Sequence, residues 1–240
     1  MENGFAGAAG VTVRVQSLAL KDDFVGREMP SLNEVISRGM VLTAVAYRGW
    51  SEVRERTAAA RADTARRLVR WLDAHDLTTL VEPDEQRILH AEVGELSHDE
   101  WMGAAWRLEG AAVMGWAGRI TRLPSYWELA RLTDVLNAMD DVPRGKAPVG
   151  PLRAEREVIM LMRTTMELLA LLERHGADPL SEAALANLAA EGFERWRRCR
   201  DDRDILERAA FERAKATRWL AGLSDTYAGA SVPLGSRLLV

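Results

Sequence analysis

One carboxylate lies among tryptophans in the middle of the chain, and it is the residue best suited to acid–base chemistry. In a helix, Trp106, Glu109, Val113 and Trp116 follow one another at spacings of three or four residues, so their side chains share one face. Apolar surroundings favour the protonated form of a carboxyl group, and indole faces attract cations. Glu109 is therefore a candidate catalytic acid or base, or the anionic contact for a cationic ligand.

The alternative role for Glu109 is structural, in an ion pair with an arginine from another helix. Arg163 and Arg213 are the candidate donors. Removing one partner of a buried ion pair commonly costs about 3–5 kcal/mol, so such a pair has its own reason to be retained. If Glu109 instead serves a site, the side chains expected to bind the ligand with it are Trp106, Arg107, Trp116, Arg163, Glu212 and Arg213.

A helix at about 98–117 is expected to carry this face. Ser97 and Glu100 form a capping box, in which the serine hydroxyl accepts the third backbone N–H and the glutamate reaches back to the cap. No charged residue occurs between 110 and 118, which predicts a buried central helix, and Gly118 is expected to end it in the left-handed conformation.

The rest of the chain also has a helical pattern. Capping residues, among them Ser51 and Ser125, and apolar residues three or four apart predict further helices at about 33–48, 51–75, 83–90, 125–140, 152–175, 181–200 and 202–223. Those that begin near Asn33, Leu152 and Asp202 are expected to pack around the central helix. Residues 11–16 alternate apolar and polar side chains, which indicates a short β-strand. We expect an all-α fold around a buried central helix.

The domain organisation follows from these elements. We expect an N-terminal extension at 1–30, one helical domain at 31–223 and a C-terminal tail at 224–240, because the last segment holds Gly, Pro and Ser without periodicity. Residues 141–151 contain three prolines and two glycines and form the clearest loop, which is not expected to divide the domain.

Composition limits the function classes. The net charge of -4 argues against nucleic-acid binding, so no nucleic-acid partner is expected. No apolar run approaches the roughly 18–20 residues that span a bilayer, so no membrane association is expected either. Cys199 is the only cysteine, which excludes an intramolecular disulfide and fits a reducing compartment. Residues 1–10 lack the features of a signal peptide, so the expected location is cytoplasmic.

No metal or other cofactor is expected. Glu95 and His98 are three residues apart, as in di-iron helical bundles, but such bundles need two such pairs and two further glutamates, and Glu95 precedes the helix cap.

The outer face of the helix at 51–75 is rich in arginine. A second arginine cluster at 195–203 surrounds Trp196 and is interleaved with acidic residues, which indicates a solvated, salt-bridged face.

A set of landmarks in a fixed order resembles an uncharacterised bacterial family of helical domains of unknown function, over about residues 31–223. The landmarks are Trp71-Leu72, Pro83-Asp84-Glu85, Trp106-Arg107-Leu108-Glu109, Trp116-Ala117-Gly118, Arg163, Glu212-Arg213 and Trp219-Leu220. The sequence departs from the family after the central helix, where Ser125-Tyr126-Trp127 replace its Asp and Cys landmarks. The resemblance implies a helical fold and no assigned activity.

Two functions remain open. The first is a non-enzymatic interaction or accessory protein, because no nucleophile–base, metal or phosphate-loop motif occurs. The alternative is a cofactor-free enzyme or small-molecule binder that uses Glu109 in a tryptophan-lined cavity. The partner is accordingly a protein or a small molecule, and a homo-oligomer is compatible with either function. A pocket of about 300 Å³ or more that opens on Glu109 would favour the alternative.

Overall fold

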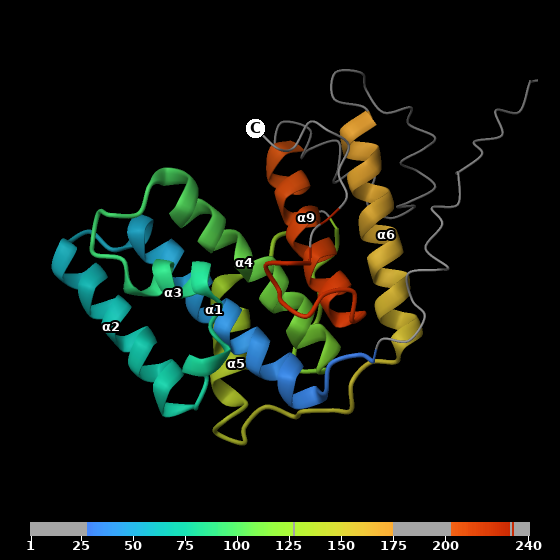
Figure 1. Cartoon of the computed structure of the whole chain (residues 1–240), viewed down its shortest axis with the longest axis horizontal. Helices are drawn as coiled ribbons and strands as arrows, with labels where there is room; N and C mark the ends of the chain where they lie inside the picture. The colour runs from blue at the N-terminus through green and yellow to red at the C-terminus, as the bar shows by residue number, and fades with distance from the viewer. Residues whose placement is uncertain (1–27, 127, 175–202, 231, 233–240) are drawn as a thin grey trace, which may run out of the picture.

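All regular elements in the described part of the chain are helices, as expected from the sequence. The computed structural model describes residues 28–126, 128–174, 203–230 and 232. The predicted strand at 11–16, the helix at 181–200 and the cluster around Trp196 and Cys199 lie outside these residues. The helices are α1 (Leu32–Arg54), α2 (Ala58–Ala74), the short 3₁₀ helix η1 (Thr78–Leu80), α3 (Pro83–His90), α4 (His98–Ala117), α5 (Leu132–Asp141), α6 (Glu155–Arg174) and α9 (Arg203–Leu220) (Figure 1).

Capping boxes begin the two central helices. The hydroxyl of Ser31 accepts the backbone N–H of Glu34, whose carboxylate accepts the N–H of Ser31 at 2.7 Å. Ser97 and Glu100 repeat this arrangement at the start of α4. Each box satisfies two backbone N–H groups that have no partner inside the helix. The predicted beginning of α4 is therefore confirmed.

The helix α1 continues past its predicted end. Ser51 does not cap a second helix, because its hydroxyl donates to the carbonyl oxygen of Arg48 at 2.7 Å inside α1, where Ser51 is buried. Thr57 caps α2 instead and accepts the N–H of Ala60 at 3.1 Å. The extra length of α1 contains the buried residues Gly49 and Ser51.

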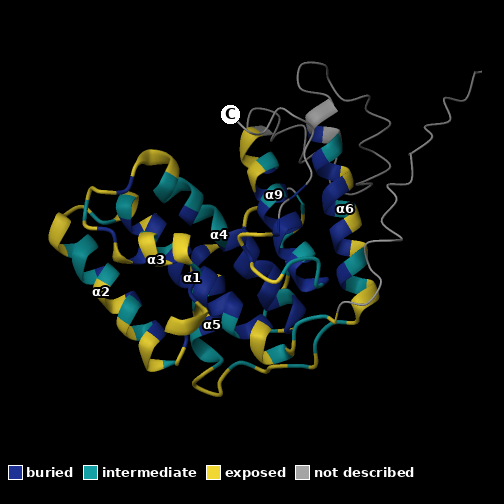
Figure 2. Cartoon of the chain, viewed as in Figure 1, coloured by how far each residue is buried: buried dark blue, intermediate teal, exposed yellow. Residues whose placement is uncertain are grey.

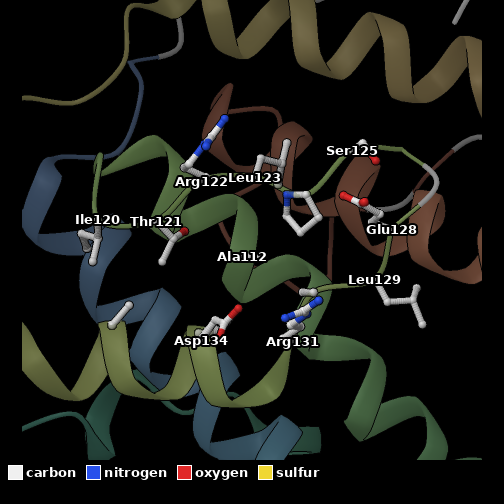
Figure 3. A pocket seen from close by; sticks show the side chains of 14 residues that line it. Ala112, Ile120, Thr121, Arg122, Leu123, Ser125, Glu128, Leu129, Arg131 and Asp134 are labelled. Atoms are coloured by element: carbon white, nitrogen blue, oxygen red, sulfur yellow. The ribbon is translucent and has the colours of Figure 1, made fainter. Parts of the chain in front are cut away.

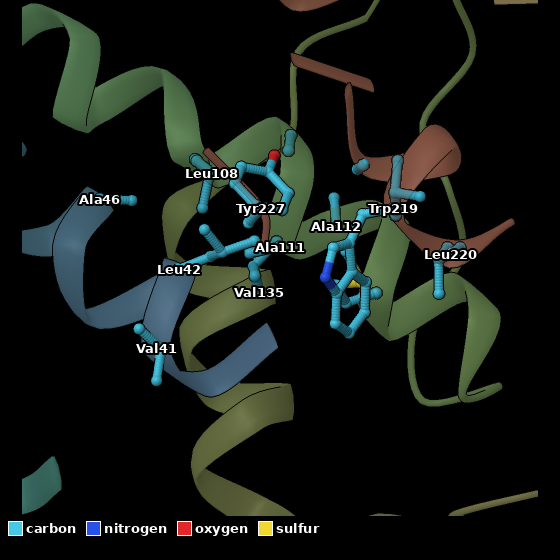
Figure 4. Packing of buried hydrophobic residues seen from close by; sticks show 14 of the residues in the cluster. Val41, Leu42, Ala46, Leu108, Ala111, Ala112, Val135, Trp219, Leu220 and Tyr227 are labelled. Atoms are coloured by element: carbon cyan, nitrogen blue, oxygen red, sulfur yellow. The ribbon is translucent and has the colours of Figure 1, made fainter. Parts of the chain in front are cut away.

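The centre of the molecule is the contact between α1 and α4, the most extensive helix pair in the described structure. Ala111 of α4 and Leu42 of α1 have no exposed surface and lie in the packed core (Figure 4). Val113 of α4 is also fully buried. Gly49 permits the close approach, since a Cβ there would lie 2.6 Å from the backbone nitrogen of Ala105. The buried central helix that the sequence predicted is thus observed.

The other helices surround this pair. Helices α2 and α3 pack on α1, while α5 contacts both α1 and α4. Helix α9 packs on α4, and α6 lies on the outer side of α9 (Figure 1). The helix from Leu152 was expected to pack directly on α4. This prediction is wrong, because α6 has α9 as its main partner. None of the described helices is long and apolar enough to cross a bilayer.

The predicted end of α4 is correct, but the conformation predicted for Gly118 and the predicted start of the next helix are wrong. Gly118 has φ -80°, and the left-handed residue that ends the helix is Arg119, with φ 58°. Ser125 does not begin a helix, because α5 starts only at Leu132. Residues 119–126 and 128–131 between α4 and α5 form no helix.

The chain after α9 belongs to the domain. Tyr227 has no exposed surface and packs among Leu42 and other core residues, so the packed region extends beyond the predicted boundary at 223 (Figure 4). Both carboxylate oxygens of Glu82 accept backbone N–H groups, one from Tyr227 and one from Ala228. Residues 227 and 228 of the predicted tail are therefore held at the N-terminal cap of α3.

We expect Gly49→Ala to lower the free energy of unfolding by about 1–3 kcal/mol, because the added methyl group meets the backbone of α4. Gly103→Ala is the matched control, since a Cβ at Gly103 has no neighbour within 4 Å. Alanine there should raise stability by about 0.5–1 kcal/mol through helix propensity. Urea unfolding of both variants measures the difference, and equal effects would contradict the proposed close approach.

Candidate functional site

Glu109 lies in a closed ion pair with Arg213 of α9. The exposed fractions of the two residues are 2% and 1%. Nε and Nη2 of Arg213 lie 2.8 Å and 2.7 Å from Oε2 of Glu109, and the backbone N–H of Ala130 donates to Oε1 at 2.8 Å. Both carboxylate oxygens therefore have partners inside the protein, and the structural alternative with Arg213 as donor is the one observed.

The same pair holds the irregular segment that follows α4. Arg213 donates from Nη1 to the carbonyl oxygen of Ser125 at 3.0 Å and from Nη2 to that of Glu128 at 2.6 Å. With the bond from Ala130 to Glu109, three backbone groups of the segment are bound by one ion pair. The ion pair of Glu109, the candidate catalytic residue, thus anchors a loop.

A hollow lies between this anchored segment and α5 (Figure 3). Its volume is about 970 Å³, and Ala112 of α4 and Val135 of α5 contribute to its apolar surface. Arg131 and Asp134 add charge on the α5 side (Figure 3). Glu109, Trp106 and Trp116 do not line this hollow, so it is not the predicted cavity. Glu109 acts on the hollow only indirectly, because it binds the loop that forms the wall.

The predicted ligand residues Arg107 and Glu212 belong to a second cluster. Nη1 of Arg107 lies 3.4 Å from a carboxylate oxygen of Glu212, and Nη2 lies 3.3 Å from Oδ2 of Asp84. The hydroxyl of Tyr227 donates to Glu212 at 3.1 Å. These side chains connect α3, α4, α9 and the last described segment, and they do not meet Glu109 in one site.

Tyr227 lies at the centre of that cluster. The charged groups of Arg38, Arg107 and Lys215 lie 5.3, 5.3 and 4.8 Å from the centroid of its ring. Burial, reinforced by the carboxylate of Glu212, raises the pKa of the Tyr227 phenol well above its ordinary value. Burial also lowers the pKa of the Lys215 ammonium group. The arrangement is a buried, internally paired network that closes the end of the domain.

One residue type in the sequence, a glycine inside a helix, indicates this cluster, although the helical periodicity does not. Gly110 lies in the middle of α4, and a Cβ there would collide with the hydroxyl of Tyr227. A glycine inside a helix costs stability, so its position often marks a close approach by another group. The spacing of Tyr227 itself carries no periodic signal.

The remaining predicted site residues are dispersed. Trp116 packs beneath Arg153, whose guanidinium carbon lies 4.6 Å from a ring centroid and whose Nε donates to the Trp116 carbonyl oxygen at 2.9 Å. The indole nitrogen of Trp106 is buried and has no partner within the described residues. Arg163 is exposed on α6 and does not pair with Glu109. The predicted ligand set is therefore not assembled in one place.

The described residues contain no group of three or more His, Cys, Asp or Glu side chains that could hold a metal ion. Glu95 accepts the backbone N–H of Glu92 at 2.8 Å, and the ring of His98 packs edge-on against Trp101. Both residues therefore have local structural roles at the α3–α4 connection.

Comparison of the chain with protein-family models, curated proteins and solved structures finds no match. The functional interpretation therefore depends on the geometry above.

Substituting Glu109 by Gln should lower the free energy of unfolding by about 3–5 kcal/mol, because Arg213 is left as an uncompensated buried charge. The matched control is the double variant Glu109→Leu/Arg213→Met, which removes both charges and should lose clearly less. Chemical denaturation measures both variants. A single variant that loses less than about 1 kcal/mol would argue against the anchoring role.

Alkaline pH provides a test of the Tyr227 cluster. A phenol whose pKa is raised by folding contributes stability below about pH 10, and that stability is lost as the pH rises further, because only the unfolded chain ionises readily. We expect Tyr227→Phe to have a shallower decline in unfolding free energy above about pH 10 than the parent protein. The lowered pKa of Lys215 acts in the opposite direction in both proteins. Parallel pH profiles would contradict the prediction.

Proposed function

We propose that this chain is a non-enzymatic interaction or accessory protein, which acts by binding a partner and not by converting a substrate. One observation carries the proposal: the carboxylate best suited to acid–base chemistry is closed on Arg213 and Ala130 and is almost fully buried. A general acid or base must reach the proton that it transfers, directly or through one water. Glu109 instead fixes the loop at 125–130.

The second cluster supports the same interpretation. Arg107 is bound by Glu212 and Asp84, and Glu212 also accepts the Tyr227 hydroxyl. The guanidinium of Arg107 is thus matched by two carboxylates of the protein itself. We infer that the buried ionic residues specify the structure and that function is carried by the surface.

Small-molecule binding is a second candidate, and the hollow beside α5 is the observation that favours it. Its volume of about 970 Å³ falls at the upper end of the range of about 300–1,000 Å³ that is usual for ligand pockets. Its surface combines apolar side chains with a few polar ones, as such pockets do. In this case Glu109 would be a positioning residue for the wall.

We further propose that the chain belongs to the bacterial family of helical domains that its landmarks resemble. The landmarks Arg107, Glu109, Glu212 and Arg213 meet in the two clusters, and the exposed landmark Asp84 pairs with Arg107, which gives their order along the chain a structural reason. A cytoplasmic location is part of the proposal, and the single cysteine agrees with a reducing compartment.

The proposal is tested by recovering the tagged chain, expressed at its natural level, after cross-linking inside the source cells. We expect a second protein in a fixed molar ratio to the chain. Recovery of the chain alone, or only of its own oligomers, under several growth conditions would contradict a dedicated protein partner. Native mass spectrometry of the same material distinguishes the second candidate, for which a bound small molecule and no second protein would be found.

A further inference from the structure

An apolar groove lies between α2 and the C-terminal end of α3 with the residues that follow it. Its volume is about 930 Å³. The α2 side consists of small apolar residues at spacings of four, three and four, namely Ala58, Ala62, Ala65 and Val69. The opposite side is formed by Leu89, Ala91 and Val93. Figure 2 shows α2 at the edge of the molecule, with exposed and half-buried residues along it.

The groove has an excess of positive charge in a protein that is acidic overall. Its charged lining residues are Arg66, Arg70, His90 and Glu92. Residues 56–70 contain five arginines and a single acidic residue, Asp63, whereas the whole chain has a net charge of -4. Asp63 is shared between Arg66, at 3.6 Å, and Arg67, at 3.2 Å.

Arg70 is less compensated still. Its Nε donates to the backbone carbonyl oxygen of Arg66 at 3.4 Å, and no carboxylate among the described residues lies within ion-pair distance of it. Guanidinium groups favour paired hydrogen bonds to carboxylates. The groove therefore combines an apolar floor with cations that internal acidic groups leave largely unmatched.

We propose that this groove docks an acidic amphipathic helix of a partner protein, an inference that rests on the proposed function. The spacing of the α2 residues is that of one helix face, and small side chains let helix axes approach to about 8 Å. Apolar residues of the partner helix fill the groove, and its acidic flank meets Arg66 and Arg70. The 17 residues of α2 extend over about 25 Å, enough for about four turns of a partner helix.

The chemistry of the groove favours a helix over a nucleic acid. Single-stranded nucleic acids are bound by cationic grooves whose aromatic side chains stack on the bases. The lining residues of this groove include no aromatic side chain apart from the imidazole of His90, and its floor consists of alanine, valine and leucine. Such a floor matches aliphatic side chains.

The test uses the full-length protein and two synthetic helical peptides of about four turns, with leucine at the a and d positions of a heptad and either glutamate or lysine elsewhere. We expect the glutamate peptide to bind at least about tenfold more tightly and to weaken with salt. The double variant Arg66→Glu/Arg70→Glu should reverse the preference to the lysine peptide. Isothermal titration calorimetry measures all four affinities.

A matched pair of variants on α2 tests the location. Ala62→Leu fills the groove and should weaken the glutamate peptide by about tenfold, whereas Ala74→Leu, at an exposed position of the same helix outside the groove, should not change it. Circular dichroism checks that both variants remain folded.

Several outcomes would overturn the proposal: neither peptide binds, both bind equally, Ala74→Leu has the same effect as Ala62→Leu, or a DNA duplex displaces the peptide through the same arginines. The peptide experiment can fail while cross-linking in cells still recovers a partner, in which case the proposed function stands and this groove is excluded. If no partner is recovered but the peptide binds, the groove is confirmed as a helix-binding surface and the proposed function fails.

Discussion

The ion pair between Glu109 and Arg213 is the interaction on which the arrangement around α4 depends. It joins two helices that are far apart in the sequence, and the same two side chains bind three backbone groups of the loop at 125–130. An isolated charge at this depth would be costly, because a buried ion is stable only when it is paired and hydrogen-bonded. The loop and the ion pair therefore stabilise each other, and the hollow beside α5 takes its wall from this contact.

Close packing of backbones imposes the second constraint. Helices α1 and α4 approach closely at Gly49, where a side chain would meet the backbone of α4. Gly110 leaves the space that the hydroxyl of Tyr227 occupies. Tyr227 in turn connects α9 with α3 through Glu212 and Glu82, so the end of the described chain is part of the core. A shortened domain that stopped at 223 would leave this space empty and would lose the hydrogen bonds that Tyr227 donates to Glu212 and Glu82.

The charged residues fall into two groups, one inside the fold and one on its surface. Inside the fold, arginine and glutamate neutralise one another and give the helices their relative positions. On the outer side of α2, arginines exceed the acidic residues near them and border an apolar groove. The internal group explains why the apparent active-site motif on α4 is structural. The external group lies on a surface that does not include the candidate catalytic residue Glu109.

The helical class and the position of the central helix could be predicted from the sequence, because both depend on local patterns. The capping box at Ser97 and the uncharged run after Glu109 identify α4 almost to the residue. The same local signal was wrong at Ser51 and Ser125, where burial in α1 and hydrogen bonding to Arg213 override capping. A serine can cap a helix, but its surroundings decide whether it does.

Which charged side chains form ion pairs depends on how the helices pack against one another. Arg163 and Arg213 were equally plausible partners for Glu109 in the sequence, and helix packing places the first on the surface and the second at hydrogen-bond distance. Tyr227 could not be assigned to the core from its own segment, because no periodicity accompanies it. Periodicity reports which face of an element is apolar, whereas the pairing of distant side chains depends on how those faces are stacked.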